Sequence, residues 1–374
     1  MKKRYLLIII LLIILSGCIS NNTYKLYDKS NLNCGFDTFC TLTAYTESED
    51  EFNKYYNIMV DKYTYYHQLF DIYHNYENIN NLKTINDNAG IKAIEVDKEI
   101  IELIKLAKQI TELSEGFFDI TNGSLLRLWH EYRDAGKLSN NNDSYGLIPS
   151  NDELQNANKH KGFEHVIIDD ANNTVYIDDV NISLDVGAIA KGYATQKIAE
   201  TLINEGMMYG SVNGGGNQRI IGSKPNGNGY KVGIQNPRVS SEDNDGIIAV
   251  IPNVINQSVV TSGDYQNYYI GENNIKLSHI IDYRTLMPAN YFCSVTIIEE
   301  DSGLADALST TIFTLSYEEG LKFIEHFNQI YQKDLKVIWI SEKPLDSTSI
   351  KANSSSELYI TTTSNLYNTL ITKQ

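Results

Sequence analysis

One short segment of the chain combines an acid, two glycines and a lysine in an arrangement that suits phosphate binding. Residues 184–194 read Leu-Asp-Val-Gly-Ala-Ile-Ala-Lys-Gly-Tyr-Ala, with Asp185 and Lys191 as the charged members. Residues 182–186 have the β-branched and apolar character of a strand, and apolar residues recur at helical spacing from residue 190. The glycines at the junction let a ligand approach the main chain, and a helix N-terminus favours phosphate. An ordinary strand-to-helix turn with a surface lysine explains this segment equally well.

The spacing of the two glycines imitates a nucleotide-binding P-loop, but the residues around it do not. Lys191 precedes the second glycine, and Tyr193 and Ala194 stand where lysine and serine or threonine are required. This mismatch excludes the NTPase interpretation.

A second candidate for chemistry is a pair of oxygen donors on a predicted helix over residues 304–313. Asp306 and Thr310 are four residues apart and therefore share one face of that helix. A carboxylate and a hydroxyl are donors that Mg²⁺ prefers. The alternative is a solvated or helix-capping pair.

Aromatic and polar residues elsewhere suggest two further site elements. Phe117 and Phe118 precede Asp119 where a predicted helix over residues 97–115 ends, so they either sandwich a planar ring system or belong to the core. His279 lies at the polar end of a predicted strand. It is a candidate for proton abstraction or phosphate contact, with a structural histidine as the alternative.

The charge balance limits the class of partner. The 374 residues include 31 Lys and Arg against 47 Asp and Glu, which gives a net charge of −16. This field repels nucleic acid, so no nucleic-acid partner is expected, and an anionic nucleotide needs a metal or local positive charge. The chain is 42% hydrophobic, which is enough to bury a sizeable core. Because predicted strands and helices are mixed along it, we expect one α+β domain over residues 31–345. Residues 346–374 are expected to form a polar tail, in which residues 358–361 could form one last strand.

The N-terminus has the order of a secretion signal. Three basic residues precede an apolar run over residues 6–15, and the tetrapeptide ending at Cys18 resembles a bacterial lipobox. We therefore expect a signal peptide over residues 1–17, lipidation of Cys18 and a polar linker over residues 18–30. The protein would then be anchored on the extracytoplasmic face of a bacterial cytoplasmic membrane. An uncleaved signal anchor is the alternative.

Three cysteines remain once Cys18 is set aside, namely Cys34, Cys40 and Cys293. Cys34 and Cys40 could pair in an oxidising compartment, but residues 36–45 alternate like a strand, which would hold the two cysteines too far apart. We therefore expect free, partly buried thiols. No Cys and His spacing indicates zinc.

Taken together, these segments resemble the ApbE family, the FAD:protein FMN transferases of bacterial envelopes. Seven blocks occur in the family's order across nearly the whole mature chain. They are Phe36-Asp-Thr, Gly116-Phe-Phe-Asp-Ile-Thr, Asp185-Val-Gly-Ala-Ile-Ala-Lys-Gly-Tyr193, Asn213-Gly-Gly-Gly, Thr261-Ser-Gly-Asp-Tyr, His279-Ile-Ile-Asp and Asp306-Ala-Leu-Ser-Thr310. The resemblance implies a T-fold-related α+β domain that uses Mg²⁺ to cleave FAD. It also implies transfer of the FMN phosphate to a threonine of an acceptor flavoprotein subunit in a membrane redox complex, with release of AMP.

The resemblance also implies roles for individual residues. The metal would be held by Asp306, Thr310 and the main-chain carbonyl of Ala188, and the catalytic residues would be His279 and Asp306. The residues that would contact FAD are Phe36, Tyr73, Phe117, Phe118, Asp119, Asp185, Lys191 and Ile281. The chain departs from the family at residues 283–286, Tyr-Arg-Thr-Leu, where Pro-Arg-Thr-Gly is usual, and at Phe36, where methionine is common. The shape of the loop beside His279 is therefore not fixed by the resemblance.

Two other functions are compatible with the same residues. An FAD pyrophosphatase would use the same metal site but let water replace the threonine hydroxyl. A flavin-binding lipoprotein without catalysis would not need the metal pair, which this chain retains.

Overall fold

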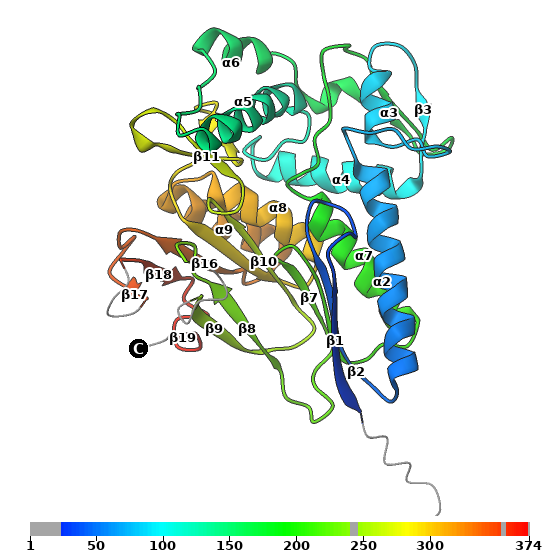
Figure 1. Ribbon diagram of the computed structural model, residues 1–374, viewed down its shortest axis with the longest axis vertical. Coiled ribbons are helices and arrows are strands. Elements are labelled where there is room, and N and C mark those ends of the chain that lie inside the picture. Colours follow the sequence, from blue (N-terminus) through cyan, green and yellow to red (C-terminus); the bar gives the residue numbers. More distant parts are fainter. Residues whose placement is uncertain (1–23, 240–245, 353–356, 373–374) are drawn as a thin grey trace, which may run out of the picture.

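A computed structural model describes residues 24–239, 246–352 and 357–372 (Figure 1). The predicted signal peptide and the lipidation site at Cys18 lie outside these ranges. Within them, strands and helices are mixed along the chain, as predicted for an α+β domain. None of the helices in the described ranges combines the length and apolar character needed to cross a bilayer.

The fold is built on a sheet of nine antiparallel strands in the order β1-β2-β6-β7-β10-β15-β16-β18-β17. The central strand β15 is buried along its whole length, which explains its run of β-branched residues. The bounds are β1 Lys25–Asn31, β2 Cys40–Thr46, β6 Gly210–Gly214, β7 Asn217–Ile221, β10 Ser258–Gly263, β15 Ser294–Glu299, β16 Lys336–Ser341, β17 Ile350–Lys351 and β18 Tyr359–Thr362.

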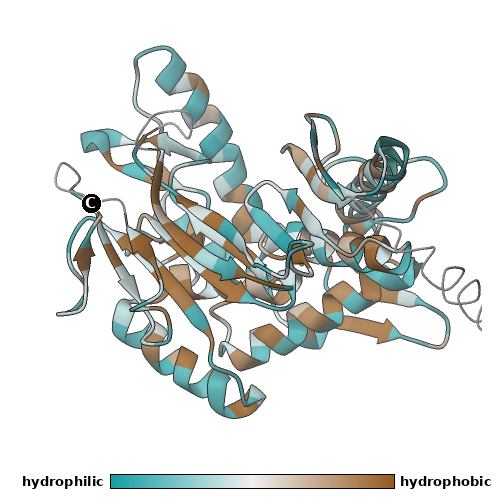
Figure 2. Ribbon diagram, turned by 90° about the horizontal axis from the view of Figure 1, so that it is seen from below, coloured by the Kyte–Doolittle hydropathy of each residue, from teal (hydrophilic) through white to brown (hydrophobic). Residues whose placement is uncertain are grey.

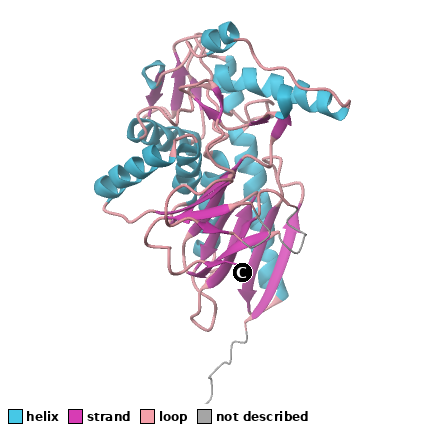
Figure 3. Cartoon of the chain, turned by 90° about the vertical axis from the view of Figure 1, so that its left-hand side faces the viewer, coloured by secondary structure: helices cyan, strands magenta, loops and turns pink. Residues whose placement is uncertain are grey.

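The two faces of this sheet have different covers (Figures 2 and 3). Successive residues of a strand point to opposite faces, so Val337 and Trp339 pack among the helices while Ile338 and Ile340 pack against a smaller sheet. The covering helices are α2 Glu49–Phe70, α7 Ala190–Asn204, α8 Ser302–Phe313 and α9 Tyr317–Tyr331. The smaller sheet contains β8 Tyr230–Gln235, β9 Ile247–Val254 and β19 Ile371–Thr372.

A further group of short elements lies beyond one end of the sheet, at the top of Figure 1. Its helices are α3 Leu82–Asp87, α4 Lys98–Leu113, α5 Gly123–Asn141 and α6 Asn151–Ala157, with 3-10 turns at Phe163–His165 and Glu272–Asn274. Its strands are β3 Ile94–Glu95, β4 Val166–Asp169, β5 Thr174–Ile177, β11 Tyr268–Ile270, β12 Lys276–Ser278, β13 Ile281–Asp282 and β14 Met287–Pro288. The candidate site lies where these elements meet α7 and α8.

Three sequence predictions about local structure are wrong. The linker predicted over residues 18–30 overlaps β1, an edge strand whose mostly polar, exposed side chains conceal its pairing with β2. Residues 182–186 form no ladder strand. The backbone of Leu184 instead pairs with the side chain of Asn86, and Ser183 makes an isolated parallel bridge with Asn122.

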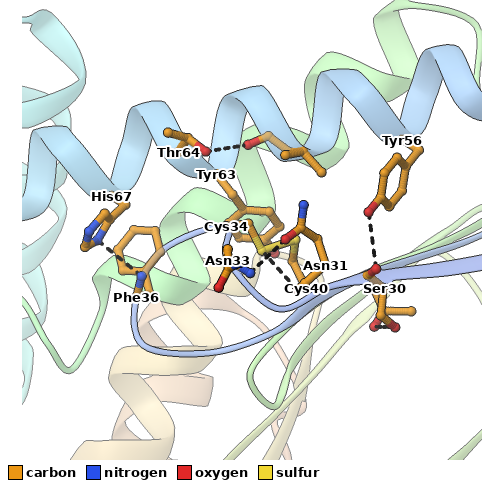
Figure 4. Close-up of a disulfide and its surroundings, with 12 residues drawn as sticks. Ser30, Asn31, Asn33, Cys34, Phe36, Cys40, Tyr56, Tyr63, Thr64 and His67 are labelled. Atoms are coloured by element: carbon orange, nitrogen blue, oxygen red, sulfur yellow. Dashed lines mark hydrogen bonds between the residues drawn. A yellow bond between two sulfur atoms is a disulfide. The ribbon is translucent and has the colours of Figure 1, made fainter.

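The third error concerns Cys34 and Cys40, which form a disulfide rather than free thiols (Figure 4). The strand begins at Cys40, not at residue 36, because Gly35, Phe36 and Asp37 all have positive φ and turn the chain back. This turn brings the two Cα atoms to 6.4 Å, within the range that a disulfide spans.

Within residues 346–374, expected to form a polar tail, the described segments contribute the strands β17, β18 and β19 to the two sheets. The last strand expected within residues 358–361 is present as β18, which pairs with β16. The strand β19 pairs with β9 in the smaller sheet.

Candidate active site

The first turn of α7 lies in close contact with α8, and glycine at position 192 permits it. A Cβ added to Gly192 would lie 2.3 Å from the carbonyl oxygen of Ser302 and 2.5 Å from the Cβ of Asp306. With no side chain in the way, the Gly192 N–H donates to the Asp306 Oδ2 at 2.8 Å. The Asp306 carboxylate is therefore held at the start of α7, although it belongs to α8.

This hydrogen bond leaves the carbonyl of Ala188 open. In a regular helix the Gly192 N–H would donate to the carbonyl four residues earlier, which is that of Ala188. Among the described residues, no hydrogen bond reaches the Ala188 carbonyl. A carbonyl oxygen and a carboxylate therefore face the same helix junction.

Thr310 follows Asp306 by one helical turn and adds a hydroxyl on the same face of α8. Its Oγ1 lies 3.3 Å from the Oγ of Ser262 at the end of β10, and Ser262 also contacts Ser309 at 2.7 Å. The three predicted metal ligands thus supply a carboxylate, a hydroxyl and a carbonyl. This all-oxygen set fits a hard cation such as Mg²⁺, which completes its shell with water or phosphate oxygens. No cluster of three His, Cys, Asp or Glu side chains competes for a metal within the described ranges.

The Asp306 carboxylate is buried, and its surroundings favour a bound cation. Only 5% of the residue is exposed. Burial raises the pKa of its carboxyl, while the charge of Lys191 and the Gly192 N–H act in the opposite direction. Lys191 makes no ion pair in the described residues, and its Nζ donates to the Gly187 carbonyl at 3.3 Å. Lys191 therefore adds positive charge beside the oxygen cluster without neutralising Asp306 directly.

Two carboxylates, those of Asp119 and Asp185, line one side of the site because the extended segments that carry them run side by side. The Asp185 N–H donates to the Ile120 carbonyl at 2.8 Å, which places residues 119–122 beside residues 183–186. Asp185 Oδ1 accepts from the Gly187 N–H, and Asp119 Oδ1 accepts from the N–H and hydroxyl of Thr121. Both carboxylates are thereby oriented by the local backbone.

Tyr73 and His130 lie on the same side of the site as Asp185. The Tyr73 hydroxyl lies 2.6 Å from Nδ1 of His130, whose Nε2 lies 3.9 Å from the Asp185 carboxylate. Tyr73 is 57% exposed, so the face of its ring is accessible to a ligand. The pKa of the Tyr283 hydroxyl is raised by burial and by the charges of Asp185 and Asp119. The charges of both carboxylates therefore reach the Tyr283 hydroxyl.

His279 is held as a neutral imidazole with one nitrogen directed by the backbone. Its Nδ1 lies 3.1 Å from the Asn267 carbonyl, which can only accept, so Nδ1 carries the proton. Burial, together with the charges of Lys191 and Arg133, lowers the pKa of His279 to about 3. Nε2 is therefore an unprotonated base at neutral pH.

The loop after His279 keeps a left-handed turn although leucine stands where the family usually has glycine. Leu286 has φ 60° and only 3% exposure, and its carbonyl accepts a hydrogen bond of 2.8 Å from the indole N–H of Trp129. Burial of the leucine side chain offsets the strain of its backbone. Arg284 is fixed by the Asp282 carboxylate at 3.0 Å and stacks over the ring of Phe117 at 4.7 Å.

The structure does not bring every predicted flavin contact to one surface. Phe118 is 2% exposed and lies in the core with α2 and α7, and Ile281 is buried against α5. Phe117 is partly buried beneath Arg284. Phe36 packs edge to face against His67 near the C-terminal end of α2, with 5.5 Å between the ring centroids (Figure 4). Asp119, Asp185, Tyr73 and Lys191 remain as the polar and aromatic lining nearest the oxygen cluster.

A cleft of about 990 Å³ lies beside the disulfide loop. It is bounded by residues 32–35 and 37–39, by the glycine turn at residues 215–216 and by β8, and it includes Thr261, which precedes Ser262 in the chain. Uncharged amide and hydroxyl side chains dominate its polar lining, with Asp37 and His67 as its charged or titratable members.

Sequence reasoning missed two residues of this site, His130 and Arg133. They are three residues apart on α5 and so share one helix face. The sequence signal was weak, because a histidine and an arginine on an amphipathic helix are usually solvated.

Comparison with known proteins gives a consistent result. Residues 36–333 match the family model described as the ApbE family. The chain is 29% identical over 256 residues to the FAD:protein FMN transferase of Vibrio cholerae. This alignment covers 68% of this chain and 72% of the relative. It is also 29% identical over 260 residues to the FAD:protein FMN transferase of Treponema pallidum, covering 66% and 68% of the two chains.

Solved structures share the fold. The ApbE protein of Thermotoga maritima aligns with a TM-score of 0.69 and 30% identity over 84% of this chain and 94% of its own. The flavin transferase ApbE of Vibrio cholerae aligns with a TM-score of 0.67 and 21% identity over 91% and 98% of the two chains. With the family model spanning most of its length and the oxygen cluster at the α7–α8 junction, this chain belongs to the ApbE family.

Proposed function

We propose that this protein transfers the FMN moiety of FAD to a threonine hydroxyl of an acceptor protein, with Mg²⁺ and release of AMP. Family membership and the names of the relatives support a flavin transferase that acts on FAD. The observation that carries the metal dependence is the open Ala188 carbonyl beside Asp306 and Thr310. A bound Mg²⁺ there would neutralise phosphate charge in a protein whose net charge is −16.

The residues around the oxygen cluster suit transfer of a phosphoryl group. The acceptor oxygen attacks the phosphorus on the FMN side of the pyrophosphate, and the bond from that phosphorus to the bridging oxygen breaks, so that AMP leaves with that oxygen. His279 Nε2 is unprotonated at neutral pH and would accept the proton of the hydroxyl once the anionic pyrophosphate offsets the charges of Lys191 and Arg133, which lower its pKa. Lys191 stabilises the negative charge that remains on the phosphate oxygens. Asp119, Asp185 and Tyr73 orient the flavin-bearing part of FAD.

The cleft beside the disulfide loop gives room for a second, polypeptide substrate. None of the residues proposed to contact FAD lines it, and its amide and hydroxyl side chains match the hydrogen bonding of a peptide backbone. It approaches the oxygen cluster through Thr261 and Ser262, since Ser262 contacts Thr310. An acceptor segment in this cleft would hold its threonine as an oriented nucleophile, which has a large advantage over water.

We further propose that the acceptor is a flavoprotein subunit of a membrane redox complex. A lipid anchor at Cys18 would hold the protein on the extracytoplasmic face of the cytoplasmic membrane, beside such complexes. The order of basic, apolar and small residues at the N-terminus supports this location.

FAD pyrophosphatase activity is the second candidate, because the same cluster would activate water when no acceptor is present. The test is incubation of the protein with FAD, Mg²⁺ and an acceptor domain from an envelope redox subunit, followed by mass spectrometry of the acceptor. Transfer predicts an acceptor with covalently bound FMN, and the Asp306→Asn variant serves as the inactive control. Consumption of FAD with every such acceptor unmodified would favour hydrolysis, and flavin binding without turnover would favour a carrier.

A further inference from the structure

Arg133 is a buried cation without a partner. It lies on the inner face of α5, where only 9% of the residue is exposed. Its Nε is fully buried and makes no hydrogen bond. Within the described residues no hydrogen bond or ion pair reaches the two terminal nitrogens either, although these are not fully buried. Removing a guanidinium from water without a partner is costly, so such a group is rare in a folded protein unless a ligand completes it.

The position of Arg133 on α5 directs it to the candidate active site. His130, one turn earlier on the same face, lies 3.9 Å from Asp185 and contacts Tyr73. Gly136, on the next turn, lies against the ring of Tyr269 in β11. Arg133 therefore lies between Asp185 and strand β11. Asn267, which contacts His279, directly precedes this strand.

The charges around Arg133 do not neutralise it. Asp134, the next residue, is exposed on the outer side of α5, and Asp185 is beyond ion-pair distance although its charge acts on the guanidinium. On the other side, the charges of Arg133 and Lys191 both act on His279 and lower its pKa. The charges of Arg133 and Lys191 thus both act on His279, and neither cation has an anionic partner at ion-pair distance in the described residues.

We propose that Arg133 binds a phosphate oxygen of the FAD pyrophosphate. A guanidinium offers planar, paired donors that match phosphate oxygens. Two unpaired cations whose charges act on the same neutral base suit a ligand with two negative charges. This inference rests on the proposed function only in taking FAD as the substrate, since the chemistry of the pocket requires an anion and does not select the flavin.

The test compares ligands that differ in phosphate content. Binding of FAD, ADP and riboflavin to the full chain is measured by calorimetry, with and without Mg²⁺, for wild type, Arg133→Gln and Arg133→Lys. We expect Arg133→Gln to weaken FAD and ADP by about tenfold or more, the usual loss of a charge-assisted hydrogen bond, while riboflavin changes less than about twofold. Arg133→Lys should recover part of the loss. The matched control is Arg127→Gln, which removes an exposed arginine from the same helix and should change none of the three.

Thermal unfolding of the ligand-free proteins separates a ligand role from a structural one. Arg133→Gln should unfold at a temperature equal to or above that of wild type, because an unpaired buried charge is removed. Three results would overturn the proposal: unchanged FAD and ADP binding, equal loss of riboflavin, or a clearly lower unfolding temperature. A wild type that binds ADP through Arg133 but neither binds nor turns over FAD would refute the proposed function and leave the anion site in place.

Discussion

The neutral state of His279 makes a prediction about stability that needs no catalytic assay. Its pKa is lowered from 6.5 to about 3 in the folded protein. As pH falls, the unfolded chain therefore binds a proton before the folded protein does. The stability that comes from this group is fully present above pH 6.5 and is lost progressively as pH falls toward 3.

The magnitude follows from the same shift. Each pH unit below 6.5 costs about 1.4 kcal/mol, so the free energy of unfolding falls by about 2 kcal/mol from pH 7 to pH 5 because of His279 alone. His279→Asn removes the titration but keeps an amide N–H in the place of Nδ1, which can still donate to the Asn267 carbonyl. The difference in stability between the two proteins should therefore change by about 2 kcal/mol over this range, with wild type losing more.

Urea unfolding followed by circular dichroism at pH 7, 6 and 5, without FAD and in the presence of a chelator, measures this difference. His326→Asn is the matched control, because His326 is exposed on α9 and away from the site. Wild-type and His279→Asn curves that stay parallel from pH 7 to pH 5 would show that His279 titrates normally. The assignment of Nε2 as a base with a strongly lowered pKa would then be wrong.

Four further predictions concern other features. Asp306→Asn should abolish FAD turnover and weaken Mg²⁺ binding at least about tenfold by calorimetry, since the carboxylate charge is lost; an active variant in chelator would refute the metal site. Leu286→Gly should lower the free energy of unfolding by about 1–3 kcal/mol in urea titrations, because the lost burial exceeds the relief of backbone strain; a more stable variant would reverse that order. Cys34→Ser should cost roughly 2 kcal/mol of stability relative to the oxidised protein, and reducing agent should remove the difference. Cys18→Ser should abolish incorporation of labelled fatty acid and release the protein from the membrane, and equal labelling of both forms would contradict lipid anchoring.

Helices were the easiest elements to predict, because their apolar faces repeat with the helical period. The helix predicted over residues 97–115 is α4, which begins after the Asp97 cap and ends before Gly116 at φ 85°. The edge strand β1 was missed because an edge strand with exposed polar side chains has no apolar alternation to read. The disulfide was missed because Phe36 and Asp37 adopt positive φ, a conformation that cannot be predicted from their residue types.

The site was predictable in its motif residues and not in its tertiary neighbours. Asp306 and Thr310 are one turn apart in sequence, so their shared face follows from helix geometry. Their meeting with Ala188 depends on the contact of two helices that are far apart in the chain. Arg133 and His130 could not be placed from sequence, because their importance comes from the position of α5 against Asp185 and β11.

The hydrogen bond from the Gly192 N–H to Asp306 links two of the proposed metal ligands, because it occupies the donor that could otherwise reach the Ala188 carbonyl. If residue 306 lacked an acceptor, the Gly192 N–H would turn to the carbonyl of Ala188, which regular helix geometry places within its reach. The helix would gain a residue at its start, and that carbonyl would no longer be available to a cation. An alanine at position 306 therefore deletes one ligand and closes off another, whereas an asparagine deletes only the charge. Comparing the two substitutions separates the electrostatic contribution of the carboxylate from its role in keeping the Gly192 N–H away from the Ala188 carbonyl.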